Sequence, residues 1–348
     1  MNLEKLGQTA SALMADGKGL LAMDESIASC NKRFGALGIP ENEEMRRQYR
    51  ELIITTPHLG ESISGLIFCD ETIRQGKLDG TPFTSLIKAS GMLLGIKVDT
   101  GEVDLAHHPN EKIAQGLDGL ANRLQEYANM GALFTKWRAE FTIGKDIPTA
   151  FCMEENAKSL AQYAALCQQA GLVPIVEPEV MMTGNHTLSH CAETTEQLLH
   201  AVFSQLHLHQ VALEGIILKP NMILAGLDCP HQENIETVAD ATVQLLQRLV
   251  PLNVSGIAFL SGGQSYELAS ARLNAMNQRF NGKLPWALTF SYSRAIQQPA
   301  LEAWNGDGNN IVEAQEKLLH RAKCNSAARK GLYNKEFEHQ VKASSIAY

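Results

Sequence analysis

The sequence predicts an α/β protein, a closed (β/α)8 barrel with extra helices at both ends of the chain. Three observations carry this prediction. Short apolar runs alternate along the chain with stretches of helical periodicity. The runs are apolar throughout, which indicates strands covered on both faces and therefore a parallel sheet. Eight such units in 348 residues fit a barrel with extensions.

Eight apolar runs are the predicted strands, and each is followed by a polar residue or a proline. They comprise residues 19–23, 65–69, 93–98, 132–137, 172–177, 214–219, 256–260 and 286–290. In the sixth run, Lys219 is followed at once by Pro220 and Asn221, a pair that ends regular structure.

Segments of helical periodicity lie between the strands. The predicted helices comprise residues 3–14, 41–54, 83–89, 117–130, 155–170, 193–208, 235–249, 266–277, 299–304 and 312–330. Residues 75–85 and 99–111 are polar or rich in turn formers and are expected as loops. An open doubly wound sheet is the alternative, but no Gly-x-Gly-x-x-Gly follows the first strand.

The chain shows no linker and no internal repeat. We therefore expect residues 1–330 to form one (β/α)8 domain. Residues 331–348 have little periodic apolar character, which is typical of a flexible tail.

Composition and charge exclude several classes of partner. With 30 basic and 38 acidic residues, a net charge of −8 and no polybasic run, neither nucleic acid nor an anionic membrane is expected to bind. The seven cysteines are scattered and odd in number, which indicates reduced thiols. No run approaches the ~18 apolar residues of a membrane span, and the N-terminus matches no signal or transit peptide. A cytoplasmic location is therefore expected.

Charged residues stand at the ends of several predicted strands. Lys219, Lys97, Lys136 and Glu177 each follow an apolar run. Because the carboxyl ends of barrel strands meet at one mouth, these side chains are expected to cluster there. A lysine beside other cations has its ammonium form disfavoured and can act as a nucleophile. The alternative is that each lysine reaches from a strand end into water.

Two groups of residues are candidate phosphate sites. The loops after the seventh and eighth strands are the usual phosphate cradle of a (β/α)8 barrel. Those loops carry Ser261, Gly262, Gly263, Ser291, Ser293 and Arg294. The second group follows the first strand, on a helix or a loop, and taken alone is more often a solvated face. It consists of Ser26, Ser29, Lys32 and Arg33. Two phosphate sites around a nucleophilic lysine indicate a bisphosphorylated carbonyl compound as substrate.

Carboxylates near the same strand ends can carry the proton transfers. Forming an iminium and breaking the adjacent C–C bond both need an acid and a base. Asp24, Glu177 and Glu179 follow apolar runs, although an Asp in the position of Asp24 is also often a helix cap. The histidine pairs of the sequence lack the further ligands that a divalent cation requires. Neither a metal nor a cofactor is expected.

Seven short blocks, in order, carry a resemblance to a known family. The sequence resembles class I fructose-1,6-bisphosphate aldolase, the Schiff-base type, over essentially the whole chain. The blocks are residues 17–26 (GKGLLAMDES), 95–99 (GIKVD), 136–138 (KWR), 174–179 (PIVEPE), 218–222 (LKPNM), 259–265 (FLSGGQS) and 288–294 (LTFSYSR).

The resemblance implies a role for each matching residue. Lys219 would form the Schiff base, Glu177 would serve as its acid and base, and Glu179 would position the lysine. Asp24 would take the C4 hydroxyl proton, while Lys136 and Arg138 would stabilise charge. The C1 phosphate would lie on Ser261, Gly262 and Arg294. The C6 phosphate would lie on Ser26, Ser29 and Lys97, with Lys32 and Arg33 nearby.

The last residue, Tyr348, matches the C-terminal tyrosine of the family, which implies proton exchange at C3 of the enamine. Two departures stand out: Ser293 replaces a common glycine, and Ile27-Ala28 replaces a more usual Thr-Gly. The resemblance implies sugar bisphosphate and triose phosphates as ligands and a homotetramer as the assembly. A Schiff-base aldolase that prefers sedoheptulose 1,7-bisphosphate and a non-catalytic scaffold on the same fold remain alternatives.

Overall fold

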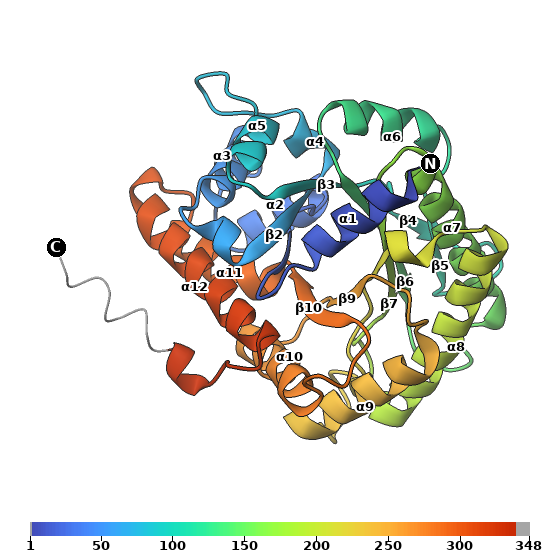
Figure 1. Ribbon diagram of the computed structural model, residues 1–348. Helices are drawn as coiled ribbons and strands as arrows, with labels where there is room; N and C mark the ends of the chain where they lie inside the picture. The colour runs from blue at the N-terminus through green and yellow to red at the C-terminus, as the bar shows by residue number, and fades with distance from the viewer. Residues whose placement is uncertain (1, 339–348) are drawn as a thin grey trace.

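Eight parallel strands close into a barrel, as the sequence predicts (Figure 1). The computed structural model describes residues 2–338. Around the barrel the strands follow chain order, and β10 pairs back with β1. They are β1 (Gly19–Ala22), β2 (Ile63–Phe68), β3 (Leu93–Lys97), β6 (Phe134–Phe141), β7 (Val173–Val180), β8 (Ile217–Leu218), β9 (Gly256–Phe259) and β10 (Ala287–Tyr292).

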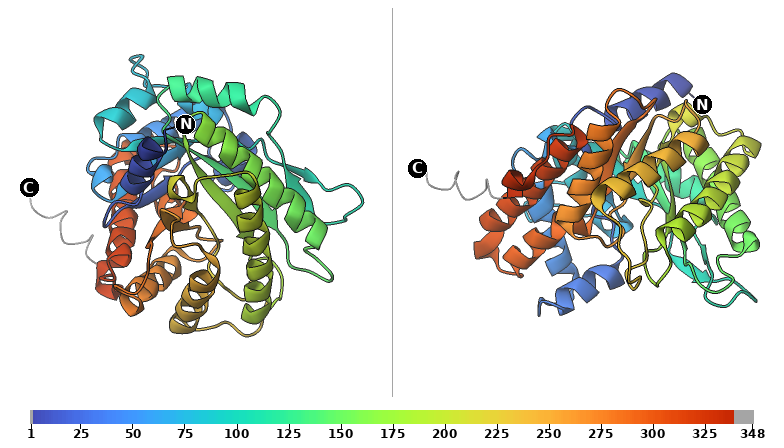
Figure 2. Two further views of the ribbon diagram at one scale, coloured as in Figure 1. Left: turned by 45° about the vertical axis from the view of Figure 1, so that its right-hand side comes forward. Right: turned by 90° about the horizontal axis from the view of Figure 1, so that it is seen from below.

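Helices surround the barrel in all three views (Figures 1 and 2). They are α1 (Leu3–Leu13), α2 (Ile27–Gly35), α3 (Glu43–Ile54), α4 (Asp70–Ile73), α5 (Phe83–Ala89), α6 (Leu120–Asn129), α7 (Ala150–Gln169), α8 (Leu188–Leu208), α9 (Ile235–Leu249), α10 (Tyr266–Arg279), α11 (Arg294–Trp304) and α12 (Ile311–Arg329). Among the described residues, no helix is long and apolar enough to span a membrane.

Helix α1 closes the amino-terminal end of the barrel. Its buried residues Leu6, Ala10 and Leu13 belong to the same apolar cluster as Phe134 and Ile175 of the barrel interior. A second and larger cluster fills the space between the strands and the surrounding helices. With the amino-terminal end filled by apolar side chains, the polar residues of the interior lie toward the carboxyl ends of the strands. We call that end the mouth.

Strands β6 and β7 run past the ends that the sequence predicted, at residues 137 and 177. In both strands a continuous apolar run gives way to alternation. Trp137, Ala139 and Phe141 join the cluster that faces the helices, and the charged residues between them point into the mouth. The two strands remain paired to their ends, with Arg138 opposite Glu177. The sequence prediction rests on apolar runs, so it does not include the alternating ends of these two strands.

Several other boundaries differ from the prediction. Helices α7 and α8 begin at Ala150 and Leu188, before the expected residues 155 and 193. The Thr149 and Thr187 side chains cap them by accepting the backbone N–H of the third residue of each helix. The expected loop 99–111 instead holds part of a hairpin, β4 (Glu102–Asp104) and β5 (Lys112–Ala114).

Two carboxy-terminal segments also differ. Helix α11 begins at Arg294, with Pro299 inside it, where the sequence predicted a start at residue 299. Beyond α12, Lys335–Glu338 form a 3-10 turn. Arg321 of α12 donates to both carboxylate oxygens of Glu338, at 2.7 and 2.5 Å. Residues 339–348, including Tyr348, lie outside the described residues, and the division into a domain and a tail stays a prediction.

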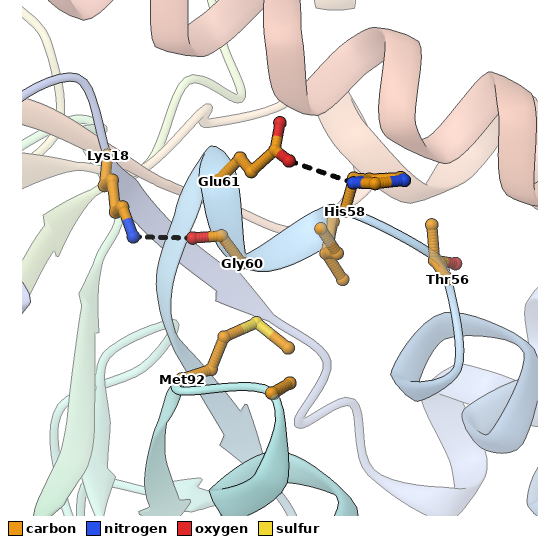
Figure 3. Close-up of a pocket in the computed structure, with 8 residues that line it drawn as sticks. Lys18, Thr56, His58, Gly60, Glu61 and Met92 are labelled. Atoms are coloured by element: carbon orange, nitrogen blue, oxygen red, sulfur yellow. Dashed lines mark hydrogen bonds and ion pairs between the residues drawn. The ribbon is translucent and has the colours of Figure 1, made fainter.

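A pocket of about 370 Å³ opens beside the starts of β1, β2 and β3, at the opposite end of the barrel from the mouth (Figure 3). Its ionisable side chains are already engaged: Lys18 Nζ donates to the Gly60 carbonyl at 2.6 Å, and His58 contacts Glu61 at 2.9 Å. This pocket therefore contributes no group to the charged cluster described next.

Candidate active site

Four charged side chains form a continuous chain of ion pairs in the barrel mouth. Lys219 Nζ lies 2.9 Å from Glu177 Oε1. The other oxygen of Glu177 lies 3.3 Å from Lys136 Nζ, which in turn lies 2.7 Å from Asp24 Oδ2. All four residues are buried, the most exposed being Asp24 at 7%. The structure thus brings together four of the predicted catalytic residues, and neither lysine extends into water.

The residues that follow β8 fix the position of Lys219. Its backbone N–H donates to the Val176 carbonyl of β7 at 2.8 Å, which continues the sheet pairing by one residue. The side chain of Asn221, two residues on, is buried and accepts the backbone N–H of Val180 at 3.0 Å. Pro220 stops the strand between these two contacts. The Lys-Pro-Asn sequence therefore holds the lysine at the end of β8, beside the middle of β7.

Charges decide the protonation states of the cluster. Burial raises the pKa of Asp24, but Lys136, Lys219 and Lys97 outweigh it and hold that pKa below its ordinary value. The same balance lowers the pKa of Glu177. Burial lowers the pKa of Lys136, but the charges of Asp24 and Glu177 outweigh burial and raise that pKa above its ordinary value. The cluster therefore holds two carboxylates and a cationic Lys136 at neutral pH.

One oxygen of this cluster has a free lone pair. Glu177 Oε2 is buried and makes no hydrogen bond with any described residue. Its 3.3 Å approach to Lys136 is an ion pair without hydrogen-bond alignment. An ionised carboxylate with an unused lone pair next to an amine can take up and return a proton.

A second layer of charge lies above the first, toward solvent. Arg138 pairs with Glu179 at 3.3 Å and also with Glu140, which lies opposite Glu179 in the β6–β7 register. Glu102, from the β4–β5 hairpin, accepts the backbone N–H of Glu140 at 3.1 Å. The resemblance implies that Glu179 positions Lys219, but among the described residues its ion-pair partner is Arg138.

This second layer has more carboxylates than cations. Burial raises the pKa of Glu179 to about 7, with Arg138 opposing and with Glu177 and Glu140 adding to the rise. Burial, followed by the charge of Glu140, raises the pKa of Glu102 to about 7. One or both of these carboxyls therefore change protonation state near neutral pH. The sequence prediction missed Glu102 and Glu140, which the alternation in β6 and the hairpin bring to the mouth.

The loop after β9 and the start of α11 form a cradle. Gly262 and Gly263 have φ values of +58° and +84°, which favour glycine. A Cβ built on Gly263 would lie 3.6 Å from the guanidinium of Arg294, so the arginine lies directly over the glycine backbone. Ser291, on β10, is buried and its Oγ makes no hydrogen bond with any described residue. These features suit an oxyanion ligand.

Ser293 has a different role from its neighbours in the cradle. Its φ is −106°, so the cost of a positive φ, expected where the family commonly has glycine, does not arise. Its hydroxyl donates to Glu25 Oε1 at 2.9 Å. Glu25 also accepts from Arg33 at 2.7 Å and pairs with Arg50 at 2.9 Å. Arg33 is thus part of a partly buried network that ties the two candidate phosphate groups together.

The remaining predicted phosphate ligands are more exposed. Ser26 caps α2 by accepting the Ser29 backbone N–H at 3.2 Å, and the two hydroxyls lie 3.0 Å apart. Lys32 is exposed on the same helix. Lys97, at the end of β3, pairs with Asp99 at 3.4 Å. Helix α2 therefore presents its first turn and one lysine beside the end of β1.

One group of potential metal ligands exists among the described residues. Candidate donor atoms of His320, Cys324 and Glu338 lie within 4.8 Å of one another. Arg321 already occupies both oxygens of Glu338, which also accepts the Tyr333 hydroxyl at 2.5 Å. Since the carboxylate is neutralised by a guanidinium, this group fits an anchor for the carboxy-terminal segment better than a cation site.

A closed (β/α)8 barrel with a buried lysine, paired carboxylates and a glycine–arginine cradle at its mouth has the architecture of a barrel enzyme, whose active site lies at that end. Comparisons with known proteins give the family. The family model of fructose-bisphosphate aldolase class-I matches residues 5–348. The chain belongs to this family and is a lyase.

Similar proteins support this assignment over nearly the whole chain. A probable fructose-bisphosphate aldolase class 1 of Xanthomonas axonopodis pv. citri is 50% identical over 95% of this chain and 99% of its own. A fructose-bisphosphate aldolase of Dictyostelium discoideum is 47% identical over 96% and 94%. A solved Plasmodium falciparum fructose-bisphosphate aldolase, in complex with TRAP and a small-molecule inhibitor, has a TM-score of 0.93 at 44% identity, covering 95% of this chain and 96% of that one.

Proposed function

We propose that this protein cleaves fructose 1,6-bisphosphate reversibly into dihydroxyacetone phosphate and glyceraldehyde 3-phosphate through a Schiff base on Lys219, without a metal. The observation that carries the proposal is the 2.9 Å contact between Lys219 Nζ and Glu177 Oε1 inside a buried chain of alternating charge. The names of the similar proteins support the substrate.

The first step is formation of the iminium. Glu177 takes a proton from Lys219, and the free amine attacks the C2 carbonyl of the ketose. Glu177 then returns a proton to the C2 hydroxyl, which leaves as water while the C=N bond forms. Lys136 stays charged beside Glu177, and its field helps the carboxyl to ionise again after each transfer.

The second step is cleavage of the C3–C4 bond. Asp24, held as a carboxylate by the charge of Lys136 at 2.7 Å, takes the proton of the C4 hydroxyl. The electron pair of the C3–C4 bond moves to C3 and into the iminium, which becomes an enamine, and the aldehyde is released. The enamine takes a proton at C3, a step that the family resemblance assigns to Tyr348. Water then releases the ketone from Lys219.

The two candidate phosphate groups place the substrate across this cluster. Ser261, Gly262 and Arg294 would bind the C1 phosphate, and C2 would then lie toward Lys219, which follows the neighbouring strand β8. Ser26, Ser29 and Lys97 would bind the C6 phosphate, beyond Asp24. The network through Glu25 supports this arrangement because it links a side chain near each group, Ser293 Oγ on one side and the Arg33 guanidinium on the other.

Covalent trapping tests the proposal. Borohydride added with dihydroxyacetone phosphate should reduce the iminium, inactivate the enzyme and add one label to the peptide that contains Lys219. Lys219→Arg should take up no label, whereas Lys317→Arg, a change at a surface lysine of α12, should be labelled like the wild type. EDTA should leave turnover unchanged. Label at another lysine, or loss of activity with the chelator, contradicts the proposal.

The same enzyme preparation decides between the alternatives. A coupled assay with fructose 1,6-bisphosphate and with sedoheptulose 1,7-bisphosphate compares kcat/KM for the two sugars. We expect the higher value for the six-carbon substrate. A higher value for the seven-carbon sugar would favour the related aldolase, and no turnover of either would favour a scaffold.

A further inference from the structure

Arg272 of α10 is a buried cation without a counter-ion. Its side chain is 4% exposed, yet it forms no salt bridge with any carboxylate of the described residues. Its single hydrogen bond there runs from Nη1 to Gln264 Oε1, at 2.8 Å, and the buried Nε has no partner. Burying an unpaired guanidinium costs folding free energy. An anion that binds nearby would offset this cost while it is bound.

The hydrogen bonds that begin at Arg272 end at the cradle. Gln264 accepts from Arg272 through its side-chain oxygen and donates from Nε2 to the Ser261 carbonyl at 2.9 Å. The backbone N–H of Gln264 donates to the same carbonyl at 3.1 Å. The chain of donors therefore runs from the guanidinium to the peptide group that joins Ser261 to Gly262.

This arrangement makes the Gly262 N–H a better donor. A carbonyl that accepts two hydrogen bonds draws electrons from its amide nitrogen, and bonds in such a chain strengthen one another. The Gly262 N–H belongs to the same peptide group as the Ser261 carbonyl. Arg272, Gln264 and Ser261 are all buried, so solvent screens the positive charge of Arg272 only weakly at this peptide group.

We propose that Arg272 is a positioning residue that strengthens binding of the C1 phosphate from behind the cradle, through Gln264 and the Ser261–Gly262 peptide. The proposal rests on the proposed function, because it takes the cradle as the C1 phosphate site. When the phosphate binds, its charge also compensates the buried guanidinium. The unliganded protein carries the cost of that charge, and the complex does not.

Other groups around Arg272 fit this role. Burial lowers the pKa of the Arg272 guanidinium to about 10. Tyr292 is the titratable neighbour that opposes burial and raises this pKa. The Tyr292 hydroxyl is itself committed to the Ala269 carbonyl at 3.2 Å. The second buried arginine of this region, Arg321, has the carboxylate of Glu338 as its partner. Of the two, only Arg272 lacks a carboxylate among residues 2–338.

The test separates the charge from the hydrogen bond. Arg272→Gln keeps an N–H donor for Gln264 but loses the charge, and Arg272→Met loses both. Arg279→Met, on the same helix with an exposed pair to Asp240, is the matched control. For each variant, calorimetry with inorganic phosphate and with dihydroxyacetone phosphate gives the affinity, and thermal unfolding with and without phosphate gives the stability.

We expect the Arg272 variants to keep or gain stability without ligand, but to lose affinity for dihydroxyacetone phosphate. Without ligand, both Arg272 variants should unfold at or above the wild-type temperature, because an uncompensated charge has gone. Both should bind dihydroxyacetone phosphate about tenfold more weakly, and phosphate should stabilise them less. Arg279→Met should match the wild type in affinity.

Two results overturn the inference. One is wild-type affinity in Arg272→Gln. The other is destabilisation of both Arg272 variants with unchanged affinity, which marks a packing role. Failure of the proposed function looks different, because the wild type itself would then bind neither phosphate nor dihydroxyacetone phosphate.

Discussion

At the scale of single residues, Arg138 is shared between carboxylates of two neighbouring strands. Glu140 and Glu179 lie opposite each other in the β6–β7 register, and both pair with the one guanidinium. Glu140 therefore affects Glu179 twice, by adding a like charge and by taking part of its counter-ion. Both effects raise the pKa of Glu179 and delay its ionisation.

Removing the Glu140 charge should shift the pH dependence of activity. In Glu140→Gln, Arg138 pairs with Glu179 alone, so the pKa of Glu179 should fall and its ionised form should persist in more acidic solution. We expect the acidic limb of kcat/KM to move by about one pH unit to lower pH. A pH series from 5 to 9 measures it. Glu196→Gln, which removes an exposed partner of Arg248, is the control, and identical profiles for both variants would show that Glu140 has no such influence.

At the scale of elements, the sequence was informative wherever one side-chain pattern persisted. The eight apolar runs became the eight barrel strands, because both faces of each are covered. The pattern failed where β6 and β7 change from apolar runs to alternation, so that Lys136 and Glu177 lie inside strands rather than at their ends. The threonine caps of α7 and α8 indicate helix starts in the sequence, but a prediction from apolar periodicity alone does not take caps into account.

The residues that sequence reasoning missed are joined by long-range contacts. Glu102 reaches the mouth through a hairpin, and Arg272 reaches the cradle through Gln264 from two turns along α10. Neither stands next to a strand end in the sequence, so no local pattern indicates them. By contrast, Lys219, Lys136 and Asp24 follow or end apolar runs, and the barrel topology alone brings them together.

Helix α1 offers a test of the element that closes the barrel. Leu13 is fully buried among residues of the barrel interior. It packs closely on β2, since a Cβ built on Gly65 would lie only 3.0 Å from Leu13 Cδ2. Leu13→Ala should lower the free energy of unfolding by about 2–5 kcal/mol, through lost burial and the cavity left behind. Leu3→Ala, at a half-exposed position of the same helix, is the matched control and should cost less than about 1 kcal/mol. Urea unfolding measures both, and equal losses would mean that α1 does not fill the barrel end.

At the scale of the whole molecule, the mouth concentrates charge whose effects on stability oppose one another. Asp24 and Glu177 have lowered pKa values in the folded state. Their contribution to stability is present above the unfolded pKa, near 4, and is lost as the pH falls through the folded values. Glu102 and Glu179, raised to about 7, act in the opposite sense. Their contribution is present below the unfolded pKa and is lost as the pH rises through 7.

Glu102→Gln isolates the second effect, because Glu102 lies outside the proposed catalytic set. Between about pH 4.5 and 7.5, folding holds a proton on Glu102 that the unfolded chain releases, so wild-type stability declines across this window. The amide of the variant does not titrate. Its stability relative to the wild type should therefore rise with pH, by at most about 3 kcal/mol and by less where solvent screens the group. Urea unfolding at half-unit pH steps measures the difference, with Glu196→Gln again as the control. A difference that stays constant across the window would mean that Glu102 is already ionised in the folded protein at pH 5, and that Arg138 neutralises the three carboxylates around it without help from a proton.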